Sequence, residues 1–319
     1  MSRSVSAENQ ITQGVIWKQI LVFFFPILFG TFFQQLYNTF DAIIVGQFVG
    51  KQALAAVGGG TSNLVNIVVN LFTGVAAGTT VVVAQGVGAR DPERVRKTVH
   101  TSAVMSLVGG LVFTVVGILA ARPALVAMAT PDDVMEYAVQ YLIAYCLGMI
   151  PSFFYNVGAG ILRAVGDTKR PLYFLIVACL VNIVLDIVFV AVMGMGALGA
   201  GLATMISQWV SAALVYISLS GTSAIYRLDK TRLGFDQASL SRVLQVGIPA
   251  GIQGNMYGIS NVILQSCINS FGTDTVAAWT SFSKVDGFFW MVSGAYGIAI
   301  TTFAGQNYGA GLYSRVRKS

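Results

Sequence analysis

The sequence predicts an all-α membrane protein, a polytopic bundle of helices that contains two parallel repeats. Three observations predict this fold: the chain is unusually apolar, it contains eight long apolar segments, and one short motif occurs twice. Of its 319 residues, 55% are hydrophobic and only 10% are charged. Because a soluble domain is about 25% charged, this composition excludes a soluble globular enzyme and an intrinsically disordered chain.

Eight segments are long and apolar enough to cross a bilayer, which takes about 20 mostly apolar residues. In chain order they cover residues 17–45, 53–83, 98–121, 134–160, 171–193, 196–221, 242–269 and 274–303. The first segment is long enough to tilt, or to extend beyond the hydrocarbon.

The basic residues alternate between the connections of these segments, and this alternation predicts the orientation of the chain. Of the 19 Lys and Arg residues, Lys51 and Arg122 fall on one side, Lys284 falls within the last segment, and the others share the opposite side. Connections rich in Lys and Arg stay in the cytoplasm. We therefore expect a multi-pass protein of the plasma (inner) membrane with a cytoplasmic N-terminus.

One short motif occurs twice, first at 84–97 and again at 305–318. Half of the positions are identical in the two copies, including a Gln, a Gly-Ala pair and the cluster Arg-Val-Arg-Lys. Pro26 and Pro249 occupy comparable places in the spans upstream. Because six segments separate the two copies, both copies enter the membrane from the same side, which is typical of the parallel repeats of secondary transporters.

The repeat predicts three parts in the chain. A complete six-helix N-terminal lobe covers residues 1–226, a cytoplasmic linker covers residues 227–241, and the first two helices of an incomplete C-terminal lobe cover residues 242–319. Since the second copy stops after two of its six spans, we expect the sequence to be a fragment that lacks about four spans.

Two carboxylates fall inside predicted spans, where an acid costs about 2.5–3.5 kcal/mol on insertion scales. Asp41 lies late in the first span with Tyr37 one turn earlier, and Asp186 lies near the middle of the fifth span with Asn182 one turn earlier. A buried carboxylate that faces a cavity can load and unload protons. Two alternatives stay open, since Asp41 could end the first span at the outer interface and Asp186 could be a structural anchor hydrogen-bonded to Asn182.

The order of several motifs resembles the multidrug and toxic compound extrusion (MATE) family over the whole chain. The motifs are Pro-Ile-Leu at 26–28, QQLYNTFD at 34–41, Val-Gly at 45–46, AQGVGA at 84–89, LRAVGDTKRP at 162–171 and NIVLD at 182–186. The resemblance implies two six-helix lobes around a central cavity. It also implies export of amphipathic, often cationic compounds in exchange for H+ or Na+.

The resemblance also implies a coupling site. The residues of the family that build one polar network in the N-terminal lobe match Tyr37, Asp41, Asn182, Asp186 and Thr204. Protonation of that network is implied to be coupled to bending of the first helix and to release of the exported compound. The bending point would be Pro26, because its missing N–H weakens the helix locally.

Further polar residues inside the spans are candidates for the lining of the cavity. They are Gln34, Asn66, Asn156, Gln253, Asn255, Lys284 and Asp286. Lys284 and Asp286 are two positions apart and do not face each other on a regular helix, so an anchoring role explains them as well as a transport role. In the resembled family the first helix of the second lobe sometimes has a Glu, whereas here Tyr257 or its neighbours occupy that region and no acid is present. This departure favours proton coupling in the N-terminal lobe.

The function expected from these residues is secondary antiport and not enzymatic catalysis. The expected coupling ion is H+, with Na+ less favoured, and no other cofactor or metal is expected. The expected partners are a small organic substrate and membrane lipid, with no nucleic acid, and the expected oligomeric state is a monomer. The alternative is a lipid-linked oligosaccharide flippase of the same two-lobe architecture, which would be expected to carry more cationic residues in its cavity.

Overall fold

The computed structural model describes residues 11–58, 60–128, 130–229, 231, 234–269 and 273–319, and this part of the chain contains helices and no strand. The helices in chain order are α2 (Ile16–Phe48), α3 (Lys51–Gly58), α4 (Gly60–Gly88), α5 (Pro92–Ala127), α6 (Asp132–Leu147), α7 (Met149–Ala164), α8 (Lys169–Asp186), the π-helical η1 (Ile187–Val192), α9 (Gly196–Ser220), α10 (Gln237–Asn269), α11 (Thr273–Gly309) and α12 (Tyr313–Lys318). The all-α membrane fold predicted from the sequence is confirmed.

Six helices of the described chain are long and apolar enough to span a membrane, and a seventh span forms if α6 and α7 count together. These two helices meet at Gly148 with a bend of 48°, so the predicted fourth span is a broken one. The predicted seventh span forms the 33-residue helix α10. This helix is long enough to span a membrane but is not among the helices that are also apolar enough. Its Gln, Asn and Ser residues make α10 more polar than the other long helices.

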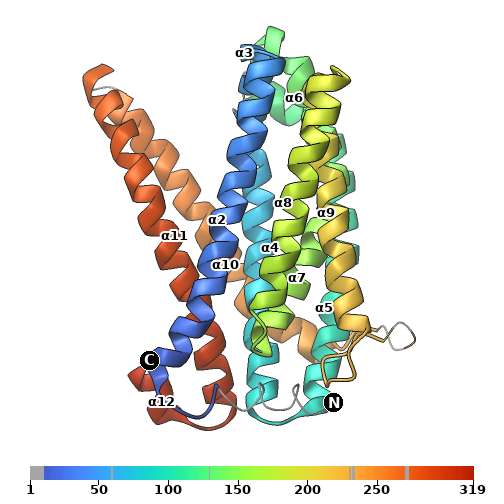
Figure 1. The fold of residues 1–319 in the computed structure, drawn as a ribbon, viewed down its shortest axis with the longest axis vertical. Helices are drawn as coiled ribbons and strands as arrows, with labels where there is room; N and C mark the ends of the chain where they lie inside the picture. Colours follow the sequence, from blue (N-terminus) through green and yellow to red (C-terminus); the bar gives the residue numbers. More distant parts are fainter. Residues whose placement is uncertain (1–10, 59, 129, 230, 232–233, 270–272) are drawn as a thin grey trace.

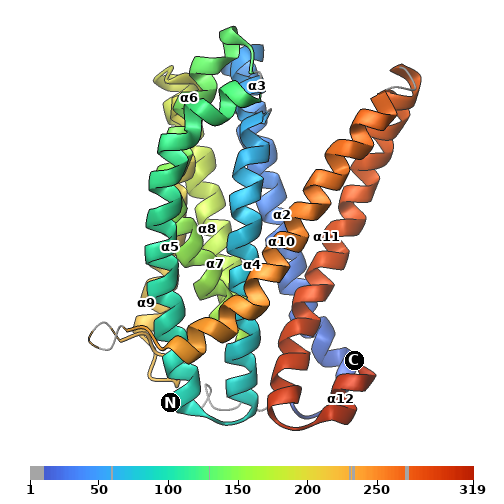
Figure 2. The same ribbon diagram turned by 180° about the vertical axis from the view of Figure 1, so that it is seen from behind.

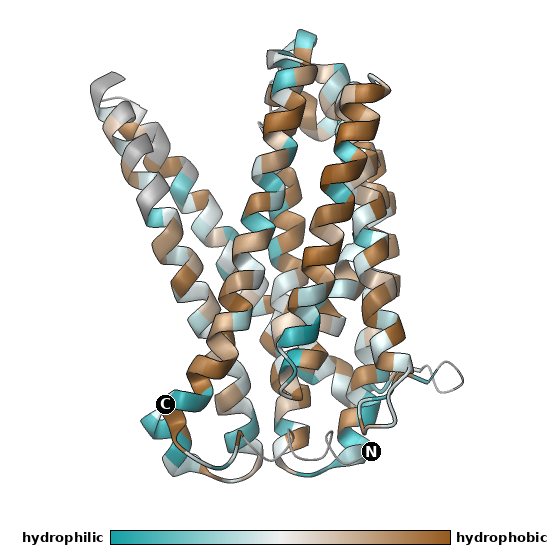
Figure 3. Cartoon of the chain, viewed as in Figure 1, coloured by the Kyte–Doolittle hydropathy of each residue, from teal (hydrophilic) through white to brown (hydrophobic). Residues whose placement is uncertain are grey.

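The helices form a bundle and a separate pair. Helices α2 and α4–α9 run roughly along the long axis of the molecule, whereas α10 and α11 slant away from them, so that the outline is a V (Figures 1 and 2). Helix α10 packs on α4, and α11 packs on α4 and α2. These contacts lie toward the end where the two arms of the V meet, which is called the narrow end below. The connections that carry most of the basic residues lie at this narrow end, where Figure 3 shows the polar colouring concentrated.

The bundle has one large apolar core between α4, α5, α6, α7 and α9. At its centre the ring of Phe72 stacks on Phe153 at 4.2 Å between centroids and meets the edge of Phe113 at 5.2 Å. Outward-facing side chains such as Leu119 and Leu180 are apolar and exposed, as expected for surfaces that contact lipid.

The repeat is also present in the helix bounds. Helices α2 and α10 are both 33 residues long, and they begin at Ile16 and Gln237. Helices α4 and α11 end at Gly88 and Gly309. Both pairs of bounds differ by the same offset in residue number as the two copies of the motif. The turns that follow contain a left-handed residue at equivalent positions, Arg90 with φ 56° and Gly311 with φ 73°.

The linker is shorter than the sequence predicted. Helix α10 begins at Gln237 and not at 242, because the carboxylate of Asp236 accepts a hydrogen bond of 2.8 Å from the backbone N–H of Ser239 and caps the helix. The linker is held on α5, where Nε2 of His100 accepts a hydrogen bond of 3.1 Å from the backbone N–H of Asp229. Residues 230 and 232–233 of the predicted linker lie outside the described part.

Candidate functional site

Asp41 lies on the inner face of α2 and is 5% exposed. It lines a cavity of about 280 Å³ together with Tyr37 from the preceding turn and Thr204 from α9. The alternative that Asp41 merely ends the first span at the interface is therefore not supported, because α2 continues to Phe48 and the carboxylate points into the bundle. Asn66 and Gln34 line the same cavity.

Asp186 and Asn182 lie one turn apart on α8 and have no exposed surface. Asp186 is the last residue before η1, so it lies at the junction where the α-helical ladder widens to a π-helix. Such widened turns often occur at functional sites, because the extra residue redirects the neighbouring side chains. The sequence predicted a regular helix here and gave no sign of this junction.

Several polar atoms of this cluster have no hydrogen-bond partner among the described residues. They are one oxygen of Asp41, both oxygens of Asp186 and both polar atoms of the Asn182 side chain. The anchor formed by a hydrogen bond between Asp186 and Asn182, which the sequence left open, is therefore not formed. Buried polar groups are costly without partners, so this cluster is better suited to exchange a proton or a cation than to stabilise the fold.

The two carboxylates come from helices that pack on each other. Asp41 lies on α2 and Asp186 on α8, and these helices are in contact. Tyr141 and Tyr145, which lie one turn apart on α6, line the cavity of Asp41. The acids are therefore surrounded by helices α2, α6, α8 and α9.

A second cavity of about 190 Å³ extends the first along the inner face of α2. Both cavities are lined by Gln34 and Tyr37, and the second continues toward Pro26. Asn156 lines it, and the Asn156 amide nitrogen donates a hydrogen bond of 2.8 Å to the backbone oxygen of Ser152. Together the two cavities connect the predicted coupling site with the predicted bending point.

This region contains residues that were not singled out from the sequence. Arg163 was counted only as an orientation signal, but it lines the second cavity and its Nε is buried without a hydrogen-bond partner among the described residues. Tyr141 and Tyr145 were not predicted either. Their spacing of four positions within an apolar span is the sequence signal that could have indicated a polar face on α6.

The candidates in the second lobe are not part of this cluster. The amide of Asn255 accepts a hydrogen bond of 3.1 Å from Asn70 and donates one of 3.2 Å to the backbone oxygen of Ile67, so it joins α10 to α4. Gln253 is exposed, and Asp286 accepts a hydrogen bond of 3.0 Å from the indole of Trp290 on its own helix. The side chain of Lys284 lies outside the described part of the structure.

Comparisons with known proteins identify related sequences and structures. The family model MatE matches residues 26–188 and 249–319. Two relatives from Bacillus subtilis (strain 168) are "Probable multidrug resistance protein YoeA", 27% identical over 95% of this chain and 67% of that protein, and "Probable multidrug resistance protein YpnP", 29% identical over 96% and 68%. The chain therefore spans about two-thirds of the length of these relatives.

A solved structure described as "Outward-facing conformation of a multidrug resistance MATE family transporter of the MOP superfamily" has the same fold. It is 27% identical, with a TM-score of 0.90 over 97% of this chain and 68% of that chain.

Proposed function

Because the chain belongs to the MATE family of multidrug efflux transporters, which is a family of transporters and not of enzymes, we propose that it exports amphipathic organic cations in exchange for protons. The proposed coupling acids are Asp41 and Asp186. The observation that carries this proposal is the buried pair of carboxylates. One oxygen of Asp41 and both oxygens of Asp186 lack protein partners among the described residues, and Asp41 faces a cavity.

The coupling follows from competition for the same negative charge. A cationic compound in the cavity is held by ionised Asp41, and protons that neutralise the pair remove this attraction. Since either protons or the cation can neutralise the pair, loading of one releases the other. A low-dielectric site strengthens this exclusion, because an unneutralised carboxylate there is costly.

The lining of the cavity supports an aromatic or cationic cargo. Asp41 is the charged residue that lines the cavity of about 280 Å³, and the rings of Tyr37, Tyr141 and Tyr145 line it as well. Tyrosine rings attract cations over their faces, which suits flat, delocalised cations. The volume lies just below the range of about 300–1,000 Å³ for small-molecule pockets, and the second cavity, which Arg163 also lines, adds about 190 Å³ to it.

The shape of the molecule supports an outward-facing state. The basic connections lie at the narrow end of the V, and by the positive-inside rule this end faces the cytoplasm. Helices α10 and α11 then diverge from the bundle toward the outside. The proposed cycle alternates between this state and one in which the cytoplasmic end separates, with Pro26 as the point where α2 bends.

The proposal is tested by ethidium efflux in proteoliposomes, with the protein expressed from its complete gene and with either a pH gradient or a Na+ gradient imposed. We expect efflux that requires the pH gradient, is lost in Asp41→Asn and is lowered less completely in Asp186→Asn. The matched control is Glu136→Gln, which removes an exposed carboxylate on α6 and is expected to keep normal efflux.

Efflux driven by the Na+ gradient alone would show that the coupling ion is Na+ and not H+. Normal efflux by Asp41→Asn would refute the assignment of the coupling acid. No efflux by the folded wild-type protein under either gradient would refute the proposed substrate class.

A further inference from the structure

We propose that the two copies of the repeated motif form the cytoplasmic gate of this transporter, and that Gly88 and Gly309 are the positioning residues on which its closure depends. The inference rests on the proposed alternating-access function and assigns residues to it that lie outside the carboxylate cluster. Gly88 is the last residue of α4, and Gly309 is the last residue of α11.

The ends of α4 and α11 lie in direct backbone contact. A Cβ atom on Gly88 would overlap the backbone oxygen of Gln306, and a Cβ atom on Gly309 would overlap the backbone oxygen of Gln85. One turn earlier on α11, a Cβ atom on Gly305 would lie 2.9 Å from Cβ of Ala84. Since the obstacles at Gly88 and Gly309 are backbone atoms, no rotation of a side chain could relieve them.

These contacts are reciprocal. Gln85 and Gly88 of the first motif copy occupy the same places as Gln306 and Gly309 of the second copy. Each copy therefore places its Gly against the Gln of the other copy, as expected at an axis that relates two parallel repeats. A contact of this kind closes or opens as a unit, because the two halves are equivalent.

Each helix end is supported where the contact is made. The side-chain nitrogen of Gln306 donates a hydrogen bond of 2.6 Å to the backbone oxygen of Ala164 at the end of α7. Arg94 donates a hydrogen bond of 3.2 Å to the Gln85 side chain, and Arg315, its equivalent in the second copy, donates one of 3.0 Å to Asn307. The contact therefore joins two stiff ends rather than two loose loops.

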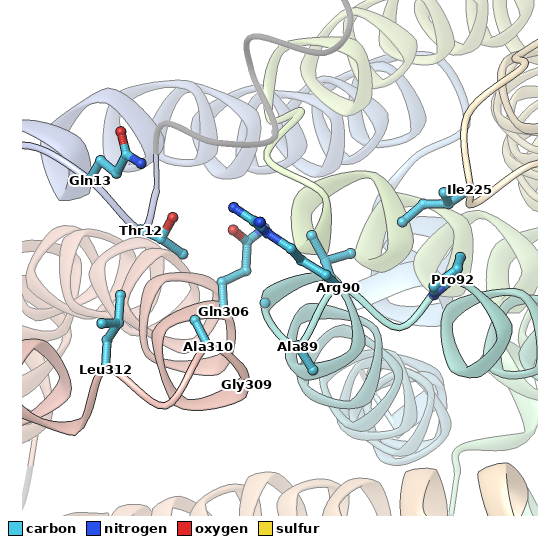
Figure 4. Close-up of a pocket in the computed structure, with 12 residues that line it drawn as sticks. Thr12, Gln13, Ala89, Arg90, Pro92, Ile225, Gln306, Gly309, Ala310 and Leu312 are labelled. Atoms are coloured by element: carbon cyan, nitrogen blue, oxygen red, sulfur yellow. The ribbon is translucent and has the colours of Figure 1, made fainter.

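The contact lies at the cytoplasmic end of the proposed pathway. Gly88, Gln306 and Gly309 line a pocket of about 860 Å³ near the narrow end of the molecule, into which the side chain of Arg90 also extends (Figure 4). The contact thus forms part of the wall of this pocket. In the cycle proposed above, cargo from the cytoplasm can reach the carboxylate pair only after this contact has opened.

The first test measures the gate itself, without cargo and without an ion gradient. Spin labels on Glu93→Cys and Tyr313→Cys, two exposed positions just beyond the two helix ends, report the separation of the ends in a background lacking Cys146, Cys179 and Cys267. In this background we expect Gly88→Ala or Gly309→Ala to shift the population toward long distances by at least about tenfold. The control is Gly297→Ala on α11, where a Cβ atom meets nothing within 4 Å.

An unchanged distance distribution in both variants would overturn the proposal. This distance measurement requires no transport. A failure of the gate proposal can therefore be distinguished from a failure of the proposed drug–proton exchange.

The second test closes the gate covalently. The pair Ala84→Cys and Gly305→Cys places two thiols directly opposite each other across the contact. Because a Cβ atom on Gly305 would lie 2.9 Å from Cβ of Ala84, the helix ends have to move apart by about 1 Å to reach the Cβ separation of a disulfide, about 3.5–4.5 Å. We expect the oxidised protein to lose transport at least about tenfold and to recover on reduction. Full transport by the oxidised, cross-linked protein would overturn the proposal, because the contact would then not need to open.

Discussion

Replacing Asp41 by Asn is expected to make the protein more stable and inactive at the same time. The amide has nearly the same size and shape as the carboxylate, so the packing around a residue that is 5% exposed is preserved. The substitution removes a charge that has no compensating cation in the cavity lining, where Asp41 is the charged residue. The opposite signs of the two effects separate a functional group from a structural one.

The magnitude follows from the surroundings of the carboxylate. An ionised Asp at the centre of a span costs about 2.5–3.5 kcal/mol on insertion scales. A buried amide without partners costs about 1–3 kcal/mol. The difference predicts that Asp41→Asn raises the free energy of unfolding by about 1 kcal/mol while the wild-type carboxylate is ionised. This gain should shrink as the pH falls, because a protonated carboxyl is neutral like the amide.

The assay is thermal or denaturant unfolding in detergent micelles at several pH values, followed by the fluorescence of a dye that reacts with exposed thiols. Glu136→Gln serves as the control and is expected to change the free energy of unfolding by less than about 0.5 kcal/mol, because its carboxylate is exposed. A loss of stability in Asp41→Asn at every pH would refute the reasoning, since it would mean that the carboxylate makes interactions that hold the fold together.

Two further predictions concern the packing and the linker. Phe72→Ala is expected to lower the free energy of unfolding by about 3–5 kcal/mol, because it removes the buried ring that stacks on Phe153 and leaves a cavity. Phe288→Ala at an exposed position should have little effect, and equal unfolding midpoints for the two variants would contradict this. Hydrogen bonds from the side chain and backbone of Ser239 hold the pKa of Asp236 below its usual value. The helix cap therefore stabilises the fold fully above the unfolded pKa of about 3.9 and is lost as the pH falls through the lower folded pKa. Asp236→Ala should accordingly be less stable than the wild type at pH 7 and approach it near pH 3, and a gap that stays constant with pH would refute this origin.

Much of the site could be predicted from the sequence because charge inside an apolar segment is conspicuous. Asp41 and Asp186 interrupt segments that are otherwise apolar, and the residues one turn before them, Tyr37 and Asn182, follow from helical spacing alone. Polar atoms of all four are buried in the structure. Thr204 was predicted through the resemblance and lines the same cavity, whereas nothing in its own surroundings in the sequence sets it apart.

Other features could not be predicted, because no local pattern encodes them. The π-helical turn after Asp186 and the bend at Gly148 are adjustments of single turns to neighbouring helices. Arg163 looked like one more basic residue at a helix end, and only packing places it against a cavity. The polar character of Asn255 gave no sign that this residue joins α10 to α4 through hydrogen bonds.

The sequence by itself determined the long apolar helices, the repeat and the two acids that have to be accommodated inside. These features are set by hydrophobicity, charge and spacing along the chain, each of which is a local property with a large free energy in a bilayer. The tertiary structure alone decided which residues of distant segments meet: that Thr204 lines the same cavity as Asp41, and that Gly88 and Gly309 each lie against the other copy's Gln. Those contacts depend on how helices cross, and crossing is decided by packing between surfaces that are far apart in the chain.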